Sequence, residues 1–157
     1  MFVAVLILMV STGLFFFYFQ VACQNILRQR YSQEYFRTIA NANCLEFPLV
    51  RKAIEDSGAP VEFSRLKMAL KCDFLALTYL LKNAANVNQR YTRDERLLIL
   101  YFRVQFVCLV ARHWLRLGES SAALTLTVIL QYFANVVGER ITKVRFGDLT
   151  VSDFFNL

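Results

Sequence analysis

The single histidine, His113, is the side chain best suited to bind a metal centre or to transfer protons near neutral pH. It stands in the segment VARHWL, with no patterned second ligand nearby. A neutral imidazole could ligate a haem or a chlorin. A lone histidine near the end of a helix is more typical of a side chain that interacts with the negative end of the helix dipole. We therefore predict no metal or cofactor site at His113.

Four cysteines could bind a metal or exchange electrons, and they lie 21, 28 and 36 residues apart, at Cys23, Cys44, Cys72 and Cys108. These separations lack the close pairs that zinc sites and redox motifs require. The spacing instead predicts free and mostly buried thiols, which suit a reducing compartment.

Acidic residues occur as the neighbours Glu55 and Asp56 and as Asp94 and Glu95. Adjacent residues on a helix point about 100° apart, so neither pair resembles two carboxylates that face each other across a cleft. The chain also lacks the glycine-rich phosphate loops and the common hydrolase and metalloprotease motifs. We predict a protein that is not an enzyme, with no catalytic, cofactor-binding or metal-binding residues.

The composition favours a membrane protein with one domain. The chain has 157 residues, of which 57% are hydrophobic and 19% are charged, whereas about 45–50% and 25% are typical. This excess of apolar residues excludes intrinsic disorder. The net charge is +6, but the basic residues form no run, so we predict no nucleic-acid partner.

The first part of the chain has no charged side chain between Met1 and Arg28. A helix over residues 2–23 would be about 33 Å long, which matches the hydrocarbon core of a bilayer. Ser11, Thr12 and Gly13 interrupt the apolar run, but such small residues allow another helix to approach. We predict a retained transmembrane anchor at residues 1–23.

A cleaved signal and a lipoprotein signal are the alternatives for this segment. A secretory signal has a basic start and an apolar segment of about 7–15 residues, and this chain has neither. The residues Val21-Ala22-Cys23 resemble the end of a bacterial lipobox. Gln20 stands where that motif needs an aliphatic residue, so lipidation of Cys23 is disfavoured.

An aromatic cluster and nearby arginines predict where the anchor meets the headgroups. The predicted interface residues are Phe15, Phe16, Phe17, Tyr18, Phe19, Arg28 and Arg30. The positive-inside rule places the N-terminus outside and the remainder in the cytoplasm. We predict a single-pass protein of the bacterial inner membrane.

The predicted fold is all-α, with a single N-terminal transmembrane helix that continues as a helical stalk over residues 24–43. A compact cytoplasmic helical bundle follows over residues 44–138, and a short irregular docking tail covers residues 139–157. Predicted bundle helices cover 48–57, 61–85 and 93–117, and a last one starts near residue 120 and stops before Gly138. The spacing of Thr92 and Glu95 predicts a capping box for the third.

The segment 93–117 is apolar on most sides, so it is predicted to be a central helix or one that a partner covers. Residues 97–111 and 122–137 could alternatively form a membrane-embedded hairpin. Both segments are short for a span, and they contain Arg103, Gln131 and Asn135. We therefore prefer bundle helices and keep the hairpin as an alternative.

Two surfaces could bind partners. Lys67, Lys71 and Lys82 fall on one helical face with Thr78, which predicts either an anionic-lipid face or an ordinary solvated face. The segment ITKVRF alternates like a short strand, and Phe154, Phe155 and Leu157 could dock on the protein's own core or on a partner.

Together these patterns favour a non-catalytic, membrane-anchored subunit that scaffolds, positions or stabilises a larger membrane complex. The expected partners are membrane lipid and other membrane-protein subunits or further copies of the chain. One alternative is an accessory subunit for electron transfer that associates with a pigment or a quinone. Another is a membrane-tethered ligand-binding or signalling module.

Overall fold

A computed structural model of the chain describes residues 2–28, 35–57, 62–83, 91–116, 118 and 120–155, without the side chains of residues 57 and 143–155. These residues form helices and no strand, so the predicted all-α class is confirmed. The six helices are α1 (Phe2–Leu27), α2 (Phe36–Ala42), α3 (Phe47–Ser57), α4 (Phe63–Asn83), α5 (Arg93–Trp114) and α6 (Ser120–Phe155).

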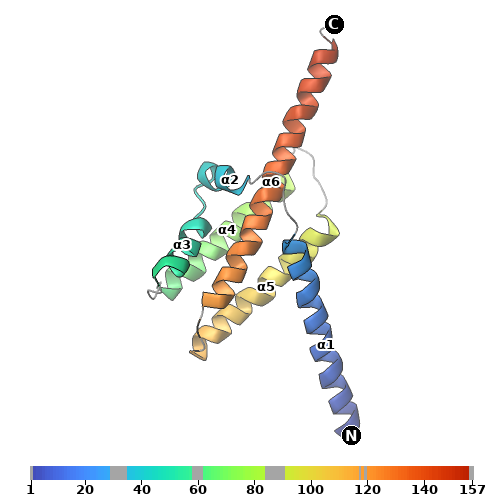
Figure 1. Cartoon of the computed structure of the whole chain (residues 1–157), viewed down its shortest axis with the longest axis vertical. Coiled ribbons are helices and arrows are strands. Elements are labelled where there is room, and N and C mark those ends of the chain that lie inside the picture. Colours follow the sequence, from blue (N-terminus) through green and yellow to red (C-terminus); the bar gives the residue numbers. More distant parts are fainter. Residues whose placement is uncertain are drawn as a thin grey trace.

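Helix α6 is the centre of the bundle, and the other five helices pack around it (Figure 1). Its side chains at Leu126, Ile129, Phe133 and Val137 are fully buried. The segment 93–117 is therefore not the central helix, and its coverage by a partner stays a prediction. Helix α5 lies at the periphery, because the bundle buries 22% of its most apolar stretch against 72% of that of α6.

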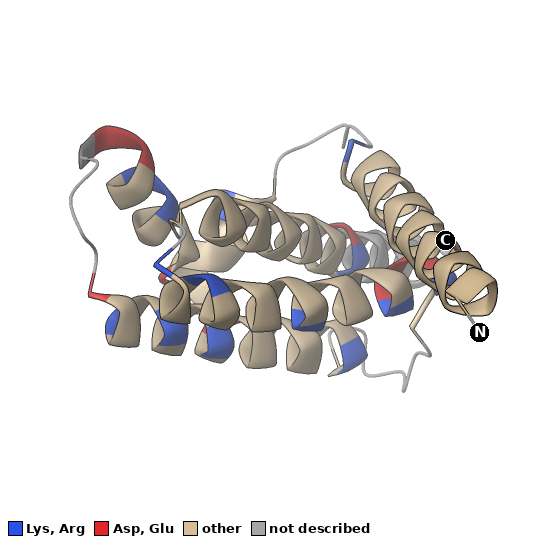
Figure 2. Cartoon of the chain, turned by 90° about the horizontal axis from the view of Figure 1, so that it is seen from below, with Lys and Arg blue, Asp and Glu red and all other residues tan. Residues whose placement is uncertain are grey.

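Helices α4 and α5 lie side by side on one side of α6 (Figure 2). The rings of Phe74 and Phe102 stack with their centroids 4.0 Å apart, and those of Phe63 and His113 stack at 3.6 Å. The start of α4 therefore meets the end of α5, and the two helices are antiparallel.

The predicted capping box of α5 is confirmed. The backbone N–H of Glu95 donates to the Thr92 hydroxyl, and the Thr92 N–H donates to Glu95 Oε2 at 3.0 Å. This local exchange satisfies two donors that the first turn of a helix would otherwise leave unpaired.

Two other helix starts are capped from distant parts of the chain. The N–H of Phe47 donates to Asp73 Oδ2 of α4 at 2.6 Å, and the N–H of Phe36 donates to Asn135 Oδ1 of α6 at 2.8 Å. Burial raises the pKa of the Asp73 carboxyl, and the hydrogen bonds from the backbone partly oppose that rise.

One buried ion pair joins three helices. Arg140 of α6 pairs with Glu95 Oε1 of α5, and it donates a second hydrogen bond to the carbonyl of Leu81 in the last turn of α4 at 2.7 Å. Only 3% of the Glu95 side chain and 15% of the Arg140 side chain are exposed. The guanidinium thus satisfies both a carboxylate and an orphan carbonyl at a helix end.

The predicted stop at Gly138 and the irregular tail are wrong, because α6 continues through Gly138 to Phe155. A Cβ at Gly138 would overlap the Cβ of Tyr35, so glycine is needed there for close packing rather than for a helix end. Beyond the bundle α6 projects away from it (Figure 1). Phe154 and Phe155 lie on this projecting backbone, whereas their side chains and Leu157 lie outside the described residues.

The predicted continuous stalk over residues 24–43 does not form. Helix α1 ends at Leu27 and α2 begins at Phe36. Figure 1 shows the two helices on either side of α6. The end of α1 packs on the bundle through Phe19, Cys23 and Ile26 instead of rising as a separate stalk.

Two smaller expectations also need correction. Helix α5 ends at Trp114, where Arg116 and Gly118 take left-handed φ values of 53° and 70°, so it ends before residue 117. Of the four free cysteines, Cys23 is buried and the other three are exposed, so the prediction of mostly buried thiols is wrong.

Gly138→Ala tests the packing of Tyr35 against α6. Alanine normally stabilises a helix by about 1 kcal/mol relative to glycine. Here we expect a net loss of about 1–3 kcal/mol in the free energy of unfolding, because the new methyl group displaces Tyr35. Denaturation followed by circular dichroism in mild detergent measures this. The matched control is Gly138→Ala in a chain that also carries Tyr35→Gly, because the second substitution removes the side chain that the new methyl group would overlap. A stabilised Gly138→Ala protein would contradict the packing.

Arg140→Met tests the buried ion pair. Removing one partner of a buried pair leaves an uncompensated charge, which costs about 3–5 kcal/mol of stability. Glu95→Gln in the same chain removes that charge while keeping an acceptor for the Thr92 N–H. We expect the double variant to be more stable than Arg140→Met alone in thermal unfolding. Strictly additive losses in the double-mutant cycle would rule out the coupling.

Candidate membrane interface

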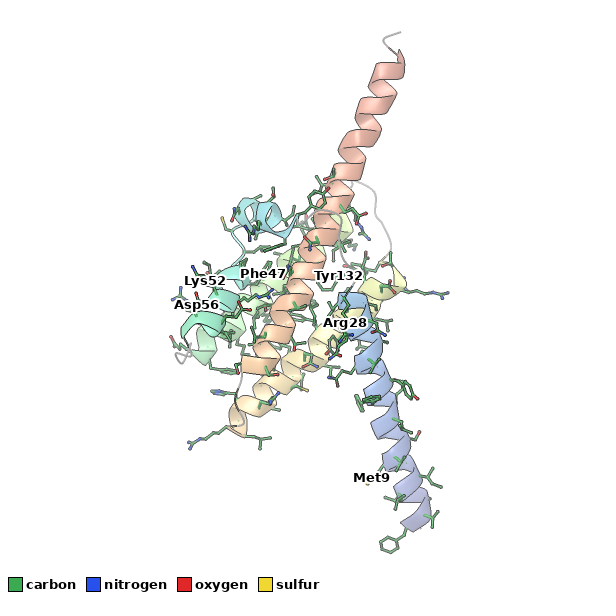
Figure 3. All side chains as sticks on the ribbon, viewed as in Figure 1. Met9, Arg28, Phe47, Lys52, Asp56 and Tyr132 are labelled. Atoms are coloured by element: carbon green, nitrogen blue, oxygen red, sulfur yellow. The ribbon has the colours of Figure 1, made fainter. Side chains whose placement is uncertain are left out.

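Most of α1 lies outside the bundle. It carries only apolar and small polar side chains from Phe2 to Tyr18, and all of them are exposed (Figure 3). The Thr12 hydroxyl donates to the carbonyl of Leu8 at 2.8 Å, so this polar group is satisfied within the helix. An exposed apolar surface of this extent is typical of a region that contacts a membrane or another protein.

Among the described residues, three helices are long and apolar enough to cross a membrane: α1, α5 and the segment Ser120–Thr142 of α6. The three helices differ in how much the bundle covers them. The bundle buries none of the most apolar stretch of α1, 22% of that of α5 and 72% of that of α6. Helix α6 also uses its polar side chains inside the bundle. Gln131 accepts a hydrogen bond from Arg51 at 2.7 Å, and Asn135 caps α2. The single-pass arrangement itself stays a prediction.

The aromatic cluster divides into exposed and packed members. Phe15, Phe16, Phe17 and Tyr18 are exposed, whereas Phe19 packs edge-to-face on Tyr101 of α5 with ring centroids 5.9 Å apart. Burial raises the pKa of the Tyr101 hydroxyl, which therefore stays neutral at physiological pH.

These contacts mark where α1 meets the bundle. The length of α1 from Phe2 to Phe19 is about 27 Å, close to the thickness of a hydrocarbon core. The contact between Phe19 and Tyr101 therefore lies at the end of the segment that could span the bilayer. Arg28 follows α1 directly and is exposed, and Arg30 lies outside the described residues.

The predicted lysine face lies on the surface of α4. Lys67, Lys71 and Lys82 are exposed there, on the side of α4 that borders α5. The structure thus brings these three residues together on one face but leaves their role as a lipid face a prediction.

A cavity of about 420 Å³ lies between α1, α5 and α6, next to the predicted interface. Its polar lining comes from Gln20 and Gln24 of α1, Gln105 and Arg112 of α5, and Ser121 of α6. These side chains could donate hydrogen bonds to a polar or anionic group. Sequence patterns gave no signal of this cavity, because its walls come from three helices that are distant in the chain.

His113 is half-buried and stacks on Phe63, which makes it part of the packing between α4 and α5. Within the part of the chain that the structure describes, no group of three or more histidine, cysteine and acidic side chains could hold a metal ion.

Comparisons of the chain with protein-family models, with curated proteins and with solved structures found no match.

Phe19→Ala tests the attachment of α1 to the bundle. The variant loses the ring contact with Tyr101, and an aromatic pair contributes about 1 kcal/mol beyond its buried area. We expect a lower midpoint in thermal unfolding followed by circular dichroism in detergent. Phe17→Ala removes an exposed ring from the same cluster and should leave the midpoint unchanged. Equal effects of the two substitutions would mean that detergent contact, and not packing, explains the loss.

Proposed function

We propose that this protein is a non-catalytic, membrane-anchored helical subunit that positions or stabilises a larger membrane assembly. The observation that carries the proposal is the division of α1 into two parts. Its residues 2–18 are apolar and uncovered, while Phe19, Cys23 and Ile26 pack on the bundle. Such a helix joins the bundle firmly to whatever surrounds α1.

The charge distribution supports the orientation of this anchor. Residues 2–27 contain no charge, and Arg28 is the first charged side chain on the bundle side. The chain as a whole has a net charge of +6. By the positive-inside rule α1 is a single pass with its N-terminus outside, and the bundle is cytoplasmic.

Within the bilayer, α1 offers one place for close contact with another helix. Gly13 has no described atom within 4 Å of where a side chain would begin, and Ser11 and Thr12 beside it are also small. Small residues let helix backbones approach closely in lipid, where packing and hydrogen bonds drive association. A second helix at Gly13, from a partner subunit or another copy, would cover part of α1.

Gly13→Ile tests this assembly role. A bulky side chain at Gly13 would separate the helices, so we expect the complex in mild detergent to become smaller on native gels. Ala4→Ile makes a similar enlargement on the opposite side of α1 and should leave the size unchanged. Resistance to alkaline extraction from membranes should be the same for both variants. A wild-type protein that runs as a single copy in mild detergent would overturn the proposed function.

A further inference from the structure

The sides of α4 and α5 that face away from α6 form one surface, which we call the α4–α5 outer face. Its basic residues are exposed and come from both helices: Lys67, Lys71, Lys82, Arg96 and Arg103. Large apolar side chains are exposed among them: Met68, Leu75, Tyr79, Leu100, Val107 and Trp114. Each helix thus presents a mixed basic and apolar surface outward.

The ring stacks between the helices fix which cations lie near one another. Phe74 stacks on Phe102 and Phe63 on His113, which sets the antiparallel register. In this register Lys71 lies about level with Arg103, and Lys82 lies about level with Arg96. The cations are therefore distributed over both helices and not along α4 alone.

Within the described residues of α4 and α5, no carboxylate belongs to this face. Asp73 and Glu95 are buried, and Asp94 is half-buried on the opposite side of α5. The cations consequently create a positive potential that the face itself does not neutralise. A surface of this kind attracts anions, and its apolar side chains suit a partner with an apolar layer beneath them.

Helix α1 projects toward the same side as the α4–α5 outer face. In Figure 1, α1 extends downward beyond the bundle, and α5 is the lower of the bundle helices. In Figure 2, α4 and α5 lie below α6, and the N-terminal end of α1 also points to that lower side. The two views agree that the free end of α1 lies on the α4–α5 side of the bundle.

The contact of Phe19 with Tyr101 brings α5 close to the level where α1 would leave the bilayer. Tyr101 lies near the middle of α5, and the exposed apolar residue Leu100 is next to it in the chain. A bilayer around α1 would therefore meet the α4–α5 outer face.

We propose that the α4–α5 outer face lies on the surface of the bilayer that α1 enters and binds its anionic headgroups. The five cations pair with lipid phosphates, and the apolar side chains reach the boundary between headgroups and acyl chains. The inference rests on the proposed insertion of α1 and not on the assembly of a complex. An acidic protein partner would also attract the cations, but the direction of α1 favours the bilayer.

The only tryptophan of the chain, Trp114, lies on this face and is 84% exposed, so it reports on contact with lipid. The experiment uses the full chain in vesicles of phosphatidylcholine with or without phosphatidylglycerol, both containing brominated acyl chains that quench tryptophan. We expect strong quenching only with phosphatidylglycerol, and weaker quenching at high salt. The absence of quenching in both kinds of vesicle would overturn the proposal.

Two matched double variants test the cations. Lys71→Gln with Arg103→Gln removes a pair from the face, whereas Lys52→Gln with Arg37→Gln removes an exposed lysine and arginine from α3 and α2. Each cation near an anionic leaflet contributes about a fivefold preference for the docked state. The first variant should therefore lose most of the lipid-dependent quenching, and the second should keep it. Equal behaviour of the two variants would overturn the proposal.

Two exposed cysteines give an independent readout without substitution. Cys72 lies beside the apolar residues of α4, and Cys44 follows α2. Phosphatidylglycerol should slow the reaction of Cys72 with a charged maleimide severalfold and leave that of Cys44 unchanged, as followed by mass spectrometry of peptides. The docked state would be excluded if Cys72 reacted with the maleimide at the same rate with and without phosphatidylglycerol. Equal quenching of Trp114 in the two kinds of vesicle would exclude it as well.

Failure here is separable from failure of the proposed function. Suppose that the protein resists alkaline extraction, but the quenching of Trp114 and the reaction rate of Cys72 are the same with and without phosphatidylglycerol. Only the proposed surface contact is then wrong. If alkaline treatment extracts the protein, α1 does not anchor it in the membrane. Both the proposed function and the proposed lipid contact are then contradicted. If both surface readouts respond while the detergent-solubilised protein is a single copy, the lipid contact holds and the assembly role fails.

Discussion

The buried pair of Arg140 and Glu95 is the interaction on which the arrangement of the helices depends. Glu95 uses one oxygen to cap the start of α5 and the other to hold Arg140 of α6. Arg140 in turn binds the carbonyl of Leu81 at the end of α4. Because α4 and α5 are antiparallel, the end of α4 lies beside the start of α5. The guanidinium of Arg140 can therefore bind the Leu81 carbonyl and the Glu95 carboxylate together. The pair thereby fixes how α4 and α5 lie side by side, and hence the surface that they share.

The attachment of α1 follows from that arrangement. Tyr101 belongs to α5, and its ring contacts Phe19 at 5.9 Å, so the position of α5 decides where α1 leaves the bundle. Cys23 is fully buried in the same contact region. Helix α1 and the bundle are consequently joined by packing as well as by the chain. This explains why the end of α1 packs on the bundle where the residue pattern favoured a continuous helical stalk.

The local capping signal in the sequence was reliable, whereas interactions between distant residues were not predictable. The capping box of Thr92 and Glu95 is encoded within four positions, and it was found. The caps that Asp73 and Asn135 provide join residues that are 26 and 99 positions apart, so no spacing reveals them. Gly138 is a second example. A glycine is typical of a helix end, and its tight contact with the distant residue Tyr35 could not be predicted from the neighbouring sequence. The sequence alone placed the lysines of α4 on one face. Which arginines of α5 lie near them is set by the register between the two helices, and the sequence does not reveal that register.

A membrane contact at the α4–α5 outer face would also resolve an electrostatic cost. Five exposed cations on one surface repel one another, and no described carboxylate of α4 or α5 offsets them there. Each would gain only about 1 kcal/mol from an anionic leaflet, which is too little to recruit a free domain firmly. Insertion of α1 changes that balance, because it holds the face beside the leaflet at a high effective concentration. Weak contacts then suffice to orient the bundle, and the orientation would follow the lipid composition of the membrane.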